Sequence, residues 1–449
     1  MEEKKILVAG AGVSGIAAAQ MVLDMGEGVI LYDGNASRSE ADLRAKFAPG
    51  ADVEIVLGTA PDEVLDRARV CCISPGIPMR APFVSQLLEH GIPIWSEIEL
   101  AYRYARGRLA AITGTNGKTT TTALTGEILR RHFPSTFVVG NIGYAYTGEA
   151  LKTREDSVTV AEVSSFQLET IEKFHPQVSA ILNITPDHLD RHGDFPTYVR
   201  MKKAITKNQT DADTCVLNYD DPVLRPFGDT LPCHVIYFSS RQELSEGLFL
   251  RGERIIWRRR GREEDILGIH DMNLLGRHNY ENVMAAVAIT SALGVPMQTI
   301  RDAVREFKAV EHRIEYVTEV RGVKYYHDSK GTNPDAAIQA VRAMVRPTVL
   351  IAGGYDKHAQ YTEWIESFGT TVKALVLIGQ TADAIEAEAR RLGFTNIVRA
   401  EDMPDAVAKC AALAEDGDAV LLSPACASWG MFDNFEQRGR IFKDCVRAL

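Results

Sequence analysis

The sequence predicts an α/β protein of about three domains with parallel sheets. Short β-branched runs alternate with helical stretches along almost the whole chain, and this alternation is typical of α/β domains. Two strand–glycine–helix junctions, at Gly10 and at Gly114, begin separate sheets. The length of 449 residues corresponds to about three domains at roughly 150 residues each.

The composition is that of a globular protein from a reducing compartment. With 45% hydrophobic and 24% charged residues, the chain is neither disordered nor collagen-like. Its net charge of −10 argues against binding to nucleic acid or to an anionic membrane surface. The seven cysteines include no CxxC pair, so we expect neither a disulfide framework nor a zinc site. The sequence shows no signal peptide and no run of about 18 apolar residues, and we therefore expect a cytoplasmic protein.

The first domain is expected to cover residues 1–96. Its apolar runs are separated by helical stretches, and Pro78, Pro82 and Pro93 mark its end. The predicted strands are residues 6–9, 29–32, 53–57 and 70–73.

The second domain is expected to cover residues 97–310. A strand that runs into a glycine loop at 109–118 opens its sheet, and a helical region at 277–307 closes it. The alternation at 247–262 predicts an antiparallel hairpin with its turn at Gly252-Glu253. The arginine run at 258–262 invites a phosphate-binding interpretation, but a solvated hairpin tip is favoured because charge runs usually face water. The other predicted strands are residues 137–139, 158–163, 178–183, 215–218 and 235–238.

The third domain is expected to cover residues 311–449. The same alternation of short apolar runs and helical stretches continues to the end of the chain. The predicted strands are residues 314–318, 323–327, 348–352, 374–378, 397–398 and 419–422.

The first glycine loop has the pattern GxGxxG. It runs from Gly10 to Gly15 between a strand and an alanine-rich helix, and Asp33 ends the next strand. Such a loop brings backbone close to a phosphate at a helix N-terminus. The pattern alone supports an NAD enzyme, a nucleotide-sugar binder or a packing motif about equally.

The second glycine loop is the more specific phosphate motif. A buried strand leads into Gly114-Thr115-Asn116-Gly117-Lys118-Thr119 at a helix start. Backbone amides and Lys118 are expected to cradle β- and γ-phosphates, and Thr119 to reach a magnesium ion. Ile112 occupies the position of the first glycine in the strict P-loop pattern.

Titratable side chains follow two other strands of the second domain. Glu162 stands at the carboxyl end of an apolar strand, and Asp187 and His188 follow the next one. Ligands of open α/β sheets bind at this edge. A carboxylate beside a P-loop is a natural magnesium ligand, although an Asp-His pair alone is often only a loop hydrogen bond.

Lys202 lies on the apolar face of a helix predicted near residues 196–207. That face also carries Tyr198, Met201 and Ile205. The lysine either extends its ammonium group to water or is paired or modified. Burial lowers a lysine pKa, and a neutral amine can add carbon dioxide to form a carbamate that ligates magnesium. From periodicity alone, extension to water is favoured.

Taken together, these segments resemble the Mur ligases, the ATP-dependent amide-forming enzymes of peptidoglycan precursor synthesis. The resemblance covers essentially the whole chain, and its most specific motifs lie in the third domain. Besides the GTNGKTTT loop, the matching segments are residues 162–168, 183–191, 276–279 and 312–313, DSKGTN at 328–333, SPACAS at 423–428 and FEQRG at 435–439.

The resemblance implies a Rossmann-like UDP-binding domain, a P-loop ATPase-like domain and a smaller Rossmann-like domain that closes over the site. It is closest to the members that add D-glutamate to UDP-N-acetylmuramoyl-L-alanine with ATP and Mg²⁺. It also implies a monomer, because each site is complete within one chain.

Site residues follow from the resemblance by position. Catalytic roles fall to Lys118, Glu162, His188 and Lys202, and the metal ligands are Thr119, Glu162, His188 and carbamylated Lys202. ATP contacts are implied for Gly114, Thr115, Asn116, Gly117, Lys118, Thr119, Thr120, Asn279, Asn282, Arg313, Asp328 and Lys330. The UDP sugar is expected at Val13, Ser14, Gly15, Asp33, Gly76 and Asn141, and D-glutamate at Thr332, Lys357, Ser428 and Phe435.

Three positions depart from the family pattern. Gly331 replaces an alanine, Trp429 stands where leucine is common, and His358 follows Lys357 where glycine is usual. The alternative functions are a sister Mur or folylpolyglutamate-type ligase, an NAD-dependent oxidoreductase and a non-catalytic ATP-gated binding module. The DNPR signature of diaminopimelate- or lysine-adding ligases does not occur in the sequence.

Overall fold

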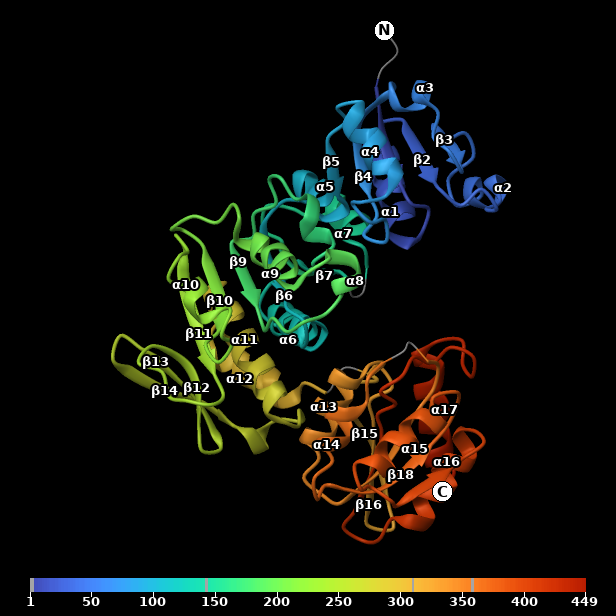
Figure 1. Ribbon diagram of the computed structural model, residues 1–449. Coiled ribbons are helices and arrows are strands. Elements are labelled where there is room, and N and C mark those ends of the chain that lie inside the picture. The colour runs from blue at the N-terminus through green and yellow to red at the C-terminus, as the bar shows by residue number, and fades with distance from the viewer. Residues whose placement is uncertain (1–3, 142–143, 309–310, 357–358) are drawn as a thin grey trace. The chain divides into compact units, whose positions relative to one another are not determined.

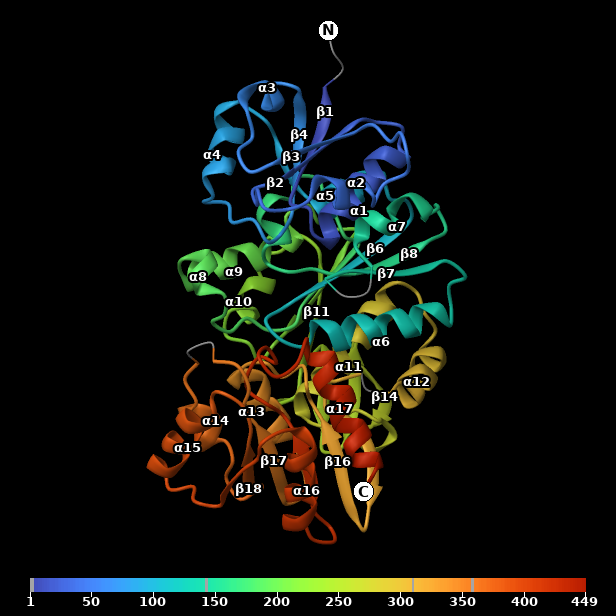
Figure 2. The same cartoon turned by 90° about the vertical axis from the view of Figure 1, so that its right-hand side faces the viewer.

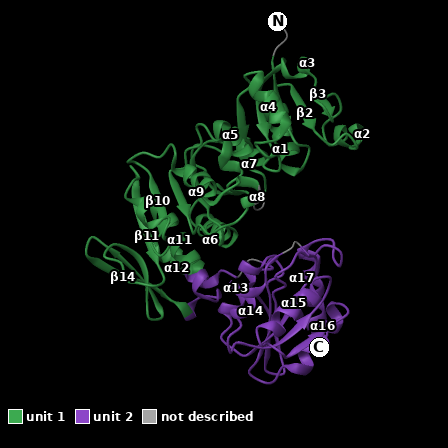
Figure 3. Ribbon diagram, viewed as in Figure 1, with its two compact units in different colours: residues 1–269, 281–304 green, residues 270–280, 305–449 purple. Residues whose placement is uncertain are grey.

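The computed structural model describes residues 4–141, 144–308, 311–356 and 359–449 (Figure 1). The chain forms two compact units, coloured separately in Figure 3. One unit comprises the residues up to 269 together with 281–304, and the other comprises residues 270–280 and 305–449. Within the described part of the chain, each helix is too short or too polar to cross a membrane.

The first unit begins with a five-stranded sheet in the order β3-β2-β1-β4-β5, in which all neighbours are parallel. This order, which doubles back at β1, is that of a Rossmann-like half-fold. Its strands are β1 (Lys5–Ala9), β2 (Val29–Asp33), β3 (Val53–Leu57), β4 (Ala68–Ile73) and β5 (Ile94–Ser96). Its helices are α1 (Val13–Asp24), α2 (Glu40–Arg44), α3 (Asp62–Leu65), α4 (Pro82–Glu89) and α5 (Glu97–Tyr104).

The same unit contains a nine-stranded sheet in the order β14-β13-β12-β11-β10-β9-β6-β8-β7. It is parallel from β7 to β12, and β12–β13 and β13–β14 are antiparallel. Its strands are β6 (Arg108–Thr113), β7 (Thr136–Gly140), β8 (Val158–Glu162), β9 (Val178–Ile181), β10 (Thr214–Asn218), β11 (His234–Ser239), β12 (Gly247–Arg251), β13 (Arg254–Arg259) and β14 (Arg262–Gly268).

Helices cover this sheet and connect its strands. Figure 2 shows α6 lying across the strands β6, β7 and β8, against which it packs. The α-helices are α6 (Lys118–Arg130), α7 (Tyr146–Glu149), α8 (Leu189–His192), α9 (Phe195–Lys203), α10 (Arg225–Gly228), α11 (Arg277–Ala292) and α12 (Met297–Glu306), and short 3₁₀ turns occur at Ala150–Lys152, Gln167–Thr170, Ala204–Thr206 and Ile269–Asp271.

One hydrophobic core joins the two sheets of the first unit. Met21 of α1 and Ile98 of α5 belong to the same buried cluster as Leu109 of β6 and Tyr146 of α7. Burying these side chains removes apolar surface of both sheets from water. This packing makes residues 4–141, 144–269 and 281–304 one compact unit. The boundary between a first and a second domain at residue 96 remains a prediction from the sequence.

The second unit carries a six-stranded sheet in the order β15-β16-β20-β17-β18-β19. It is parallel except for the pair β15–β16. Its strands are β15 (Glu315–Val320), β16 (Val323–His327), β17 (Thr348–Ala352), β18 (Val372–Leu377), β19 (Ile397–Arg399) and β20 (Ala419–Leu422). Its helices are α13 (Pro334–Ala343), α14 (Thr362–Glu366), α15 (Ala382–Arg391), α16 (Met403–Leu413) and α17 (Phe435–Arg447).

The predicted α/β class is confirmed, and the main differences concern short or interrupted elements. The strands β5 and β14 were not predicted from the sequence patterns. A break at residues 293–296, which ends at Pro296, divides the expected helical region into α11 and α12. The hairpin turn at Gly252-Glu253 is confirmed. The arginine run at 258–262 contains a second hairpin turn, where Arg260 and Gly261 have positive φ angles.

Candidate functional site

The second glycine loop connects β6 to α6 at the carboxyl edge of the larger sheet. Gly117 is the N-cap of α6 and has φ +85°. A Cβ atom there would lie 2.2 Å from Oδ1 of Asn282, so only glycine allows that side chain to approach the loop. Asn282, a predicted ATP residue, accepts a hydrogen bond from Thr121 at 3.3 Å. The helix N-terminus also presents backbone N–H groups suited to an anion.

Two other segments hold this loop in place. The backbone N–H of Asn116 donates to Oδ1 of Asn183 at 2.8 Å, and Asn183 returns a bond to the Asn116 carbonyl at 3.1 Å. The hydroxyl of Thr115 lies 3.1 Å from that of Tyr198 and accepts from the N–H of Thr185 at 3.0 Å. These bonds tie the loop to the segment after β9 and to α9.

Two lysines meet at the carbonyl oxygen of Gly114. Nζ of Lys118 donates to it at 2.9 Å and to the Thr115 carbonyl at 2.8 Å. Nζ of Lys202 donates to the same Gly114 oxygen at 2.7 Å and lies 4.7 Å from the Tyr198 ring centroid. Two amino groups are thus held beside the loop that is predicted to bind phosphate.

Lys202 is buried, with 2% of its surface exposed, so its side chain does not extend to water as the helical period alone favoured. Of the predicted apolar face, Tyr198 and Ile205 are also buried, and Met201 is half-buried. Burial, together with the charge of Lys118, holds the pKa of Lys202 well below its ordinary value. A neutral amine at this position is a nucleophile toward carbon dioxide.

A pocket of about 620 Å³ brings many of the predicted residues together. It is lined by three predicted catalytic residues, Lys118, His188 and Lys202, and by two predicted UDP-sugar residues, Gly76 and Asn141. The other lining residues are Pro75, Pro78, Arg80, Ser164, Ser165, Phe166, Asp187, Arg191 and Tyr198. The pocket thus combines cations from the larger sheet with backbone from the loop after β4.

Glu162 lies at the end of β8, as predicted, and is buried. Oε1 accepts a hydrogen bond from Nδ2 of Asn141 at 3.0 Å, and Oε2 accepts none from any described residue. A buried carboxylate oxygen without a donor is costly, and a cation at this oxygen would remove that cost. Thr119, buried in the first turn of α6, is the hydroxyl predicted to share such a cation.

His188 stands at the N-terminus of α8 with φ +52°, and its side chain is half exposed. Its ring packs edge-on against Phe166 with the centroids 5.0 Å apart, and Nε2 lies 3.4 Å from Oδ2 of Asp187. The sequence-based alternative, a local bond within an Asp-His pair, is therefore present. The same imidazole also lines the pocket, and its role at the metal stays a prediction.

The first glycine loop forms a separate and more open site. The N–H of Ala11 donates to Oδ2 of Asp33 at 2.9 Å, and Nε of Arg38 pairs with that oxygen at 3.2 Å. Val13 is 86% exposed and lines a shallow pocket of about 630 Å³ with Arg38. A Cβ at Gly15 would lie 1.7 Å from the Gly10 carbonyl, so glycine is required there.

In the second unit, Arg313 precedes β15 near Asp328 at the end of β16. Burial raises the pKa of Asp328 to about 7, against the charge of Arg313 and a hydrogen bond from Ser423. Burial and the same arginine lower the pKa of His278 to about 4. Nε of Arg313 is buried and donates to no described residue, which suits an arginine that binds an anion.

Arg438 of α17 ties the two most specific motifs together, and sequence reasoning assigned it no role. It is fully buried, and it donates to the Ser329 hydroxyl at 3.0 Å, the Ser329 carbonyl at 2.8 Å and the Cys426 carbonyl at 3.1 Å. These contacts join DSKGTN to SPACAS. The only sequence signal was the arginine in the FEQRG segment, which composition and period cannot distinguish from a surface residue.

The remaining predicted residues of the second unit lie around these loops. Ser428 is buried, Thr332 and Phe435 are half-buried, and Nζ of Lys330 lies 5.6 Å from the Phe435 ring centroid. Asn279 is buried and donates to the Leu275 carbonyl at 2.7 Å. Lys357 and His358 lie outside the described residues. The other predicted residues, Ser14 and Thr120, lie in the first turns of α1 and α6.

Two of the family departures can be examined. At Gly331, a Cβ atom would lie 2.3 Å from Oδ2 of Asp328, so an alanine there would displace that carboxylate. Trp429 is 54% exposed and packs edge-on against Tyr355, with the ring centroids 5.6 Å apart.

Arg191 also emerges as a structural part of the pocket, although the sequence only placed it within a motif. Arg191 donates to the carbonyls of Pro75 and Ile77 at 3.0 and 2.9 Å and pairs with Glu169 at 3.0 Å. It therefore holds the loop around Gly76 against the larger sheet. Long-range contacts of this kind leave no periodic signal in a sequence.

Three family models match successive parts of the chain. They are the Mur ligase MurD-like N-terminal domain at residues 4–96, the Mur ligase middle domain at 112–290 and the Mur ligase glutamate ligase domain at 312–426. Together they account for most of the chain.

Curated relatives match the whole length. A protein of Lachnospira eligens named UDP-N-acetylmuramoylalanine--D-glutamate ligase is 53% identical over 449 residues, 100% of both chains. Its namesake from Caldanaerobacter subterraneus is 43% identical over 453 residues, 100% of this chain and 99% of that one.

Solved structures share the fold. UDP-N-acetylmuramate-alanine ligase MurC of Thermotoga maritima covers 99% of both chains with 19% identity and a TM-score of 0.60. A structure of MurF from Acinetobacter baumannii covers 99% of this chain and 94% of its own, with 16% identity and a TM-score of 0.62.

Proposed function

The chain belongs to the Mur ligase family, and from that premise we propose that it joins D-glutamate to UDP-N-acetylmuramoyl-L-alanine at the expense of ATP. Relatives that match from end to end carry the name of this enzyme. The geometric observation that carries the proposal is the pocket in which Lys118, His188 and Lys202 face the loop around Gly76.

The chemistry requires an activated acid, because a carboxylate and an amine do not form an amide spontaneously at neutral pH. The L-alanyl carboxylate attacks the γ-phosphorus of ATP, giving an acyl phosphate and ADP. The amine of D-glutamate then attacks the acyl carbon, and the tetrahedral intermediate expels inorganic phosphate. The amine loses one proton as the amide forms.

Phosphoryl transfer depends mainly on positioning and on neutralising charge. The loop from Gly114 to Thr120 binds the phosphates of ATP through the backbone amides at the start of α6 and through the ammonium of Lys118, while the amides of Thr115 and Asn116 stay bonded to Asn183. Thr115 and Asn116 are fixed by side chains of other elements. We therefore expect only a small conformational change of the loop when the nucleotide binds. Asn279, Asn282, Arg313, Asp328 and Lys330 complete the ATP contacts in this proposal.

Magnesium would be held by Thr119, Glu162, His188 and the carbamate of Lys202. The buried Oε2 of Glu162, which accepts no hydrogen bond from a described residue, supports a cation there, and hard oxygen donors suit Mg²⁺. The bound cation supplies charge neutralisation for the phosphate oxygens. Everything else in the reaction is done by the chain's own groups and the substrates.

The carbamate of Lys202 forms when its neutral amine adds to carbon dioxide and releases one proton, giving an anionic N–COO⁻ group. Two features support it. Burial and the neighbouring Lys118 hold the pKa of the amine low, and both lysines otherwise share the single Gly114 oxygen. A carbamate at position 202 would be an anion beside the ammonium group of Lys118, and the two groups would attract each other.

The two remaining substrates are assigned to opposite sides of the reaction. The UDP sugar is bound by Val13, Ser14, Gly15 and Asp33 of the first sheet together with Gly76 and Asn141. D-glutamate is bound by Thr332, Lys357, Ser428 and Phe435. We further propose a three-domain division at residues 1–96, 97–310 and 311–449, and a monomer that works in the cytoplasm and binds neither nucleic acid nor membrane.

Release of ADP tests this function. The purified chain is incubated with ATP, Mg²⁺ and UDP-N-acetylmuramoyl-L-alanine, and single amino acids are added in turn. We expect ADP release that requires D-glutamate and exceeds that with L-glutamate, L-lysine, glycine or L-alanine by about a hundredfold or more. Preference for another amino acid would assign the chain to a sister ligase. Turnover of NADH, followed at 340 nm, would instead favour an oxidoreductase.

A further inference from the structure

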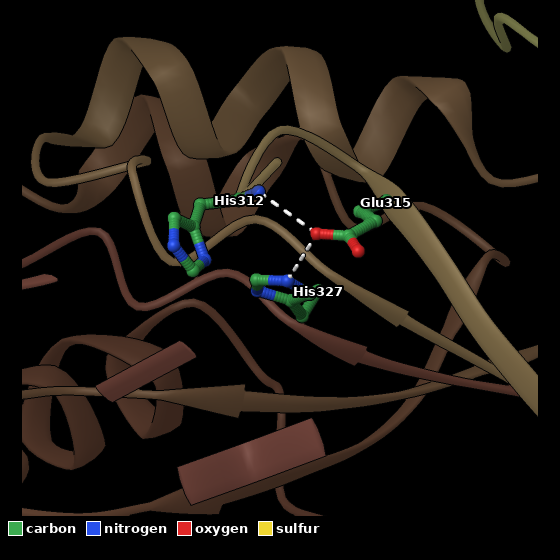
Figure 4. A group of neighbouring side chains, drawn as sticks. All are labelled: His312, Glu315 and His327. Atoms are coloured by element: carbon green, nitrogen blue, oxygen red, sulfur yellow. Dashed lines mark hydrogen bonds and ion pairs between the residues drawn. The ribbon is translucent and has the colours of Figure 1, made fainter. Parts of the chain in front are cut away.

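A buried cluster of two histidines and one glutamate lies at the start of β15 (Figure 4). His312 and Glu315 come from the turn that leads into β15, and His327 ends β16. Both rings are almost completely buried, with 4% and 0% of the residues' surface exposed. We use the name histidine clamp for the set His312, Glu315, His327 and Lys443, the last of which comes from α17.

Glu315 is the centre of the histidine clamp. Its Oε2 accepts a hydrogen bond from Nε2 of His327 at 2.8 Å and another from the backbone N–H of His312 at 3.0 Å. Its Oε1 lies 3.3 Å from Nζ of Lys443. One carboxylate therefore connects the turn before β15, the end of β16 and the helix α17.

The turn that this carboxylate closes has an unusual backbone. His312 and Ile314 have φ angles of +71° and +46°. This left-handed conformation is uncommon for residues other than glycine, and especially so for a β-branched residue such as Ile314. Arg313 lies between them, and its direction is set by the two strained neighbours. Such a backbone persists only where surrounding contacts determine it, and the bonds to Glu315 supply them.

The turn is also tied to the DSKGTN segment and to α17. The carbonyl of His312 accepts from the N–H of Lys330 at 3.1 Å. A Cβ atom at Gly439 would lie 2.4 Å from Nδ1 of His312 and 2.8 Å from Cε1 of His327. Glycine at this position therefore allows α17 to pack directly against both imidazole rings.

The chemistry of the cluster favours hydrogen bonding over a metal ion. Two imidazoles and a carboxylate with atoms within 4.8 Å of one another resemble a zinc site in composition. However, Oε2 of Glu315 already accepts two N–H groups, and the Lys443 ammonium lies beside Oε1. Although burial alone raises the pKa of Glu315, these partners lower it to about 2, so the anion is satisfied without a metal ion.

We propose that the histidine clamp is a positioning device that holds the strained turn at 312–315, so that Arg313 is presented to the phosphates of ATP. Glu315, His327 and Lys443 are positioning residues, because they act through Arg313 and touch no reactant. The inference rests on the proposed function in one respect, that Arg313 binds ATP. It adds residues to which neither the motifs nor the family resemblance gave a role.

Glu315→Gln in the full-length enzyme is the main test. The substitution keeps the shape of the side chain but removes the charge that accepts the bonds from His327 and from the turn; Lys443 keeps its nearer partner, Glu311, at 2.6 Å. We expect the KM for ATP to rise about tenfold, the cost of a misplaced hydrogen bond to a charged group, while the KM for D-glutamate changes less than about twofold. The control is Glu319→Gln, an exposed glutamate on the same strand.

The double variant Arg313→Ala/Glu315→Gln separates positioning from general stability. If Glu315 acts through Arg313, adding Glu315→Gln to Arg313→Ala leaves the KM for ATP unchanged, since residues in one pathway are not additive. Full additivity of the two effects, or an unchanged KM in Glu315→Gln alone, would overturn the clamp. A wild-type enzyme without D-glutamate-dependent turnover would contradict the proposed function instead.

His327 provides a second, graded test. His327→Gln retains a side-chain N–H for Glu315, whereas His327→Phe has none, so the glutamine variant should keep a lower KM for ATP than the phenylalanine variant. Thermal melting with and without zinc accompanies these assays. One equivalent of zinc that raises the melting temperature of the wild type, but not of His327→Phe, would replace the clamp by a metal site.

Discussion

The two glycine loops start from similar strand–glycine–helix sequences, yet the structure supports them in different ways. The first is fixed chiefly by Asp33 and Arg38 and leaves Val13 exposed. The second is tied through Thr115 and Asn116 to two other segments and has two lysines directed at one of its carbonyls. A loop at which bonds are made and broken must be preorganised, whereas a loop that only binds one end of a substrate needs fewer supports.

Loss of Lys118 should have the largest effect. Lys118→Ala removes the ammonium beside the second loop, and without it we expect the rate of ADP release to fall at least about 10³-fold. The melting temperature of the variant, measured alongside, shows whether the loss of rate comes from the site or from a loss of stability. Arg130→Ala, at the exposed end of the same helix, is the control. A wild-type rate in Lys118→Ala would remove the second loop from the mechanism.

Replacing Lys202, which lies on α9, tests the contribution of that helix to the site at the second loop. On the proposed carbamate role, Lys202→Ala should lose about 10²-fold or more of its activity, and added short carboxylates such as formate or acetate should restore part of it. Lys203→Ala is a matched control, because Nζ of Lys203 instead lies 4.4 Å from the Phe227 ring centroid. Full activity in Lys202→Ala would contradict the role, as would no incorporation of ¹³CO₂ by the wild type in NMR spectra.

The buried carboxyl group of Glu97 is connected through Gln167 to the pocket beside the second loop. Replacing it should change how the free energy of unfolding depends on pH. Burial raises the pKa of Glu97 from 4.5 to about 7, although Gln167 donates to it at 2.7 Å. Gln167 in turn accepts from Ser164, which lines the pocket. The native state therefore binds more protons than the unfolded chain between these pH values, so the stability from protonated Glu97 is lost as the pH rises through about 7.

Glu97→Gln should remove this dependence. Relative to wild type, the variant should gain free energy of unfolding between pH 5 and pH 8, by no more than about 3 kcal/mol. Urea denaturation at the two pH values measures the difference. The same pH profile in both proteins would show that Glu97 does not carry a raised pKa.

A substitution at the first glycine loop should have the smallest effect on catalysis. Asp33→Asn weakens the pairing with Arg38 and the acceptor for the Ala11 N–H, so we expect the KM for the UDP substrate to rise about threefold to tenfold. The turnover number should stay within about twofold, because no reacting group is attached to this loop. Glu40→Gln on exposed α2 is the control. A large fall in kcat with an unchanged KM would erase the contrast between the two loops.

The sequence predicted local features well. Strand β6, the turn before Lys118 and the apolar face that carries Lys202 all follow from short-range patterns, and the structure confirms each of them. The helical period did not predict that the Lys202 amine would be buried, since the partner at Gly114 lies 88 residues away. Burial of an amine is decided by tertiary contacts, which a helical wheel does not contain.

Other features escaped for similar reasons. The three-residue strand β5 is too short to show an alternating pattern, and β14 is highly charged where it pairs with β13. Arg438 and Glu315 look like surface residues in sequence, because only the folded chain brings Ser329 and His327 to them. Residue roles given by family resemblance alone stay predictions until variants are measured.

The central claim is that the pocket beside the second loop activates a carboxylate by phosphorylation. The most direct measurement uses UDP-N-acetylmuramoyl-L-alanine labelled with ¹⁸O in its carboxylate, together with ATP and D-glutamate. We expect one ¹⁸O atom per turnover to appear in the released inorganic phosphate, because that oxygen bridges carbon and phosphorus in the acyl phosphate. Unlabelled phosphate, released together with the amide product, would contradict it.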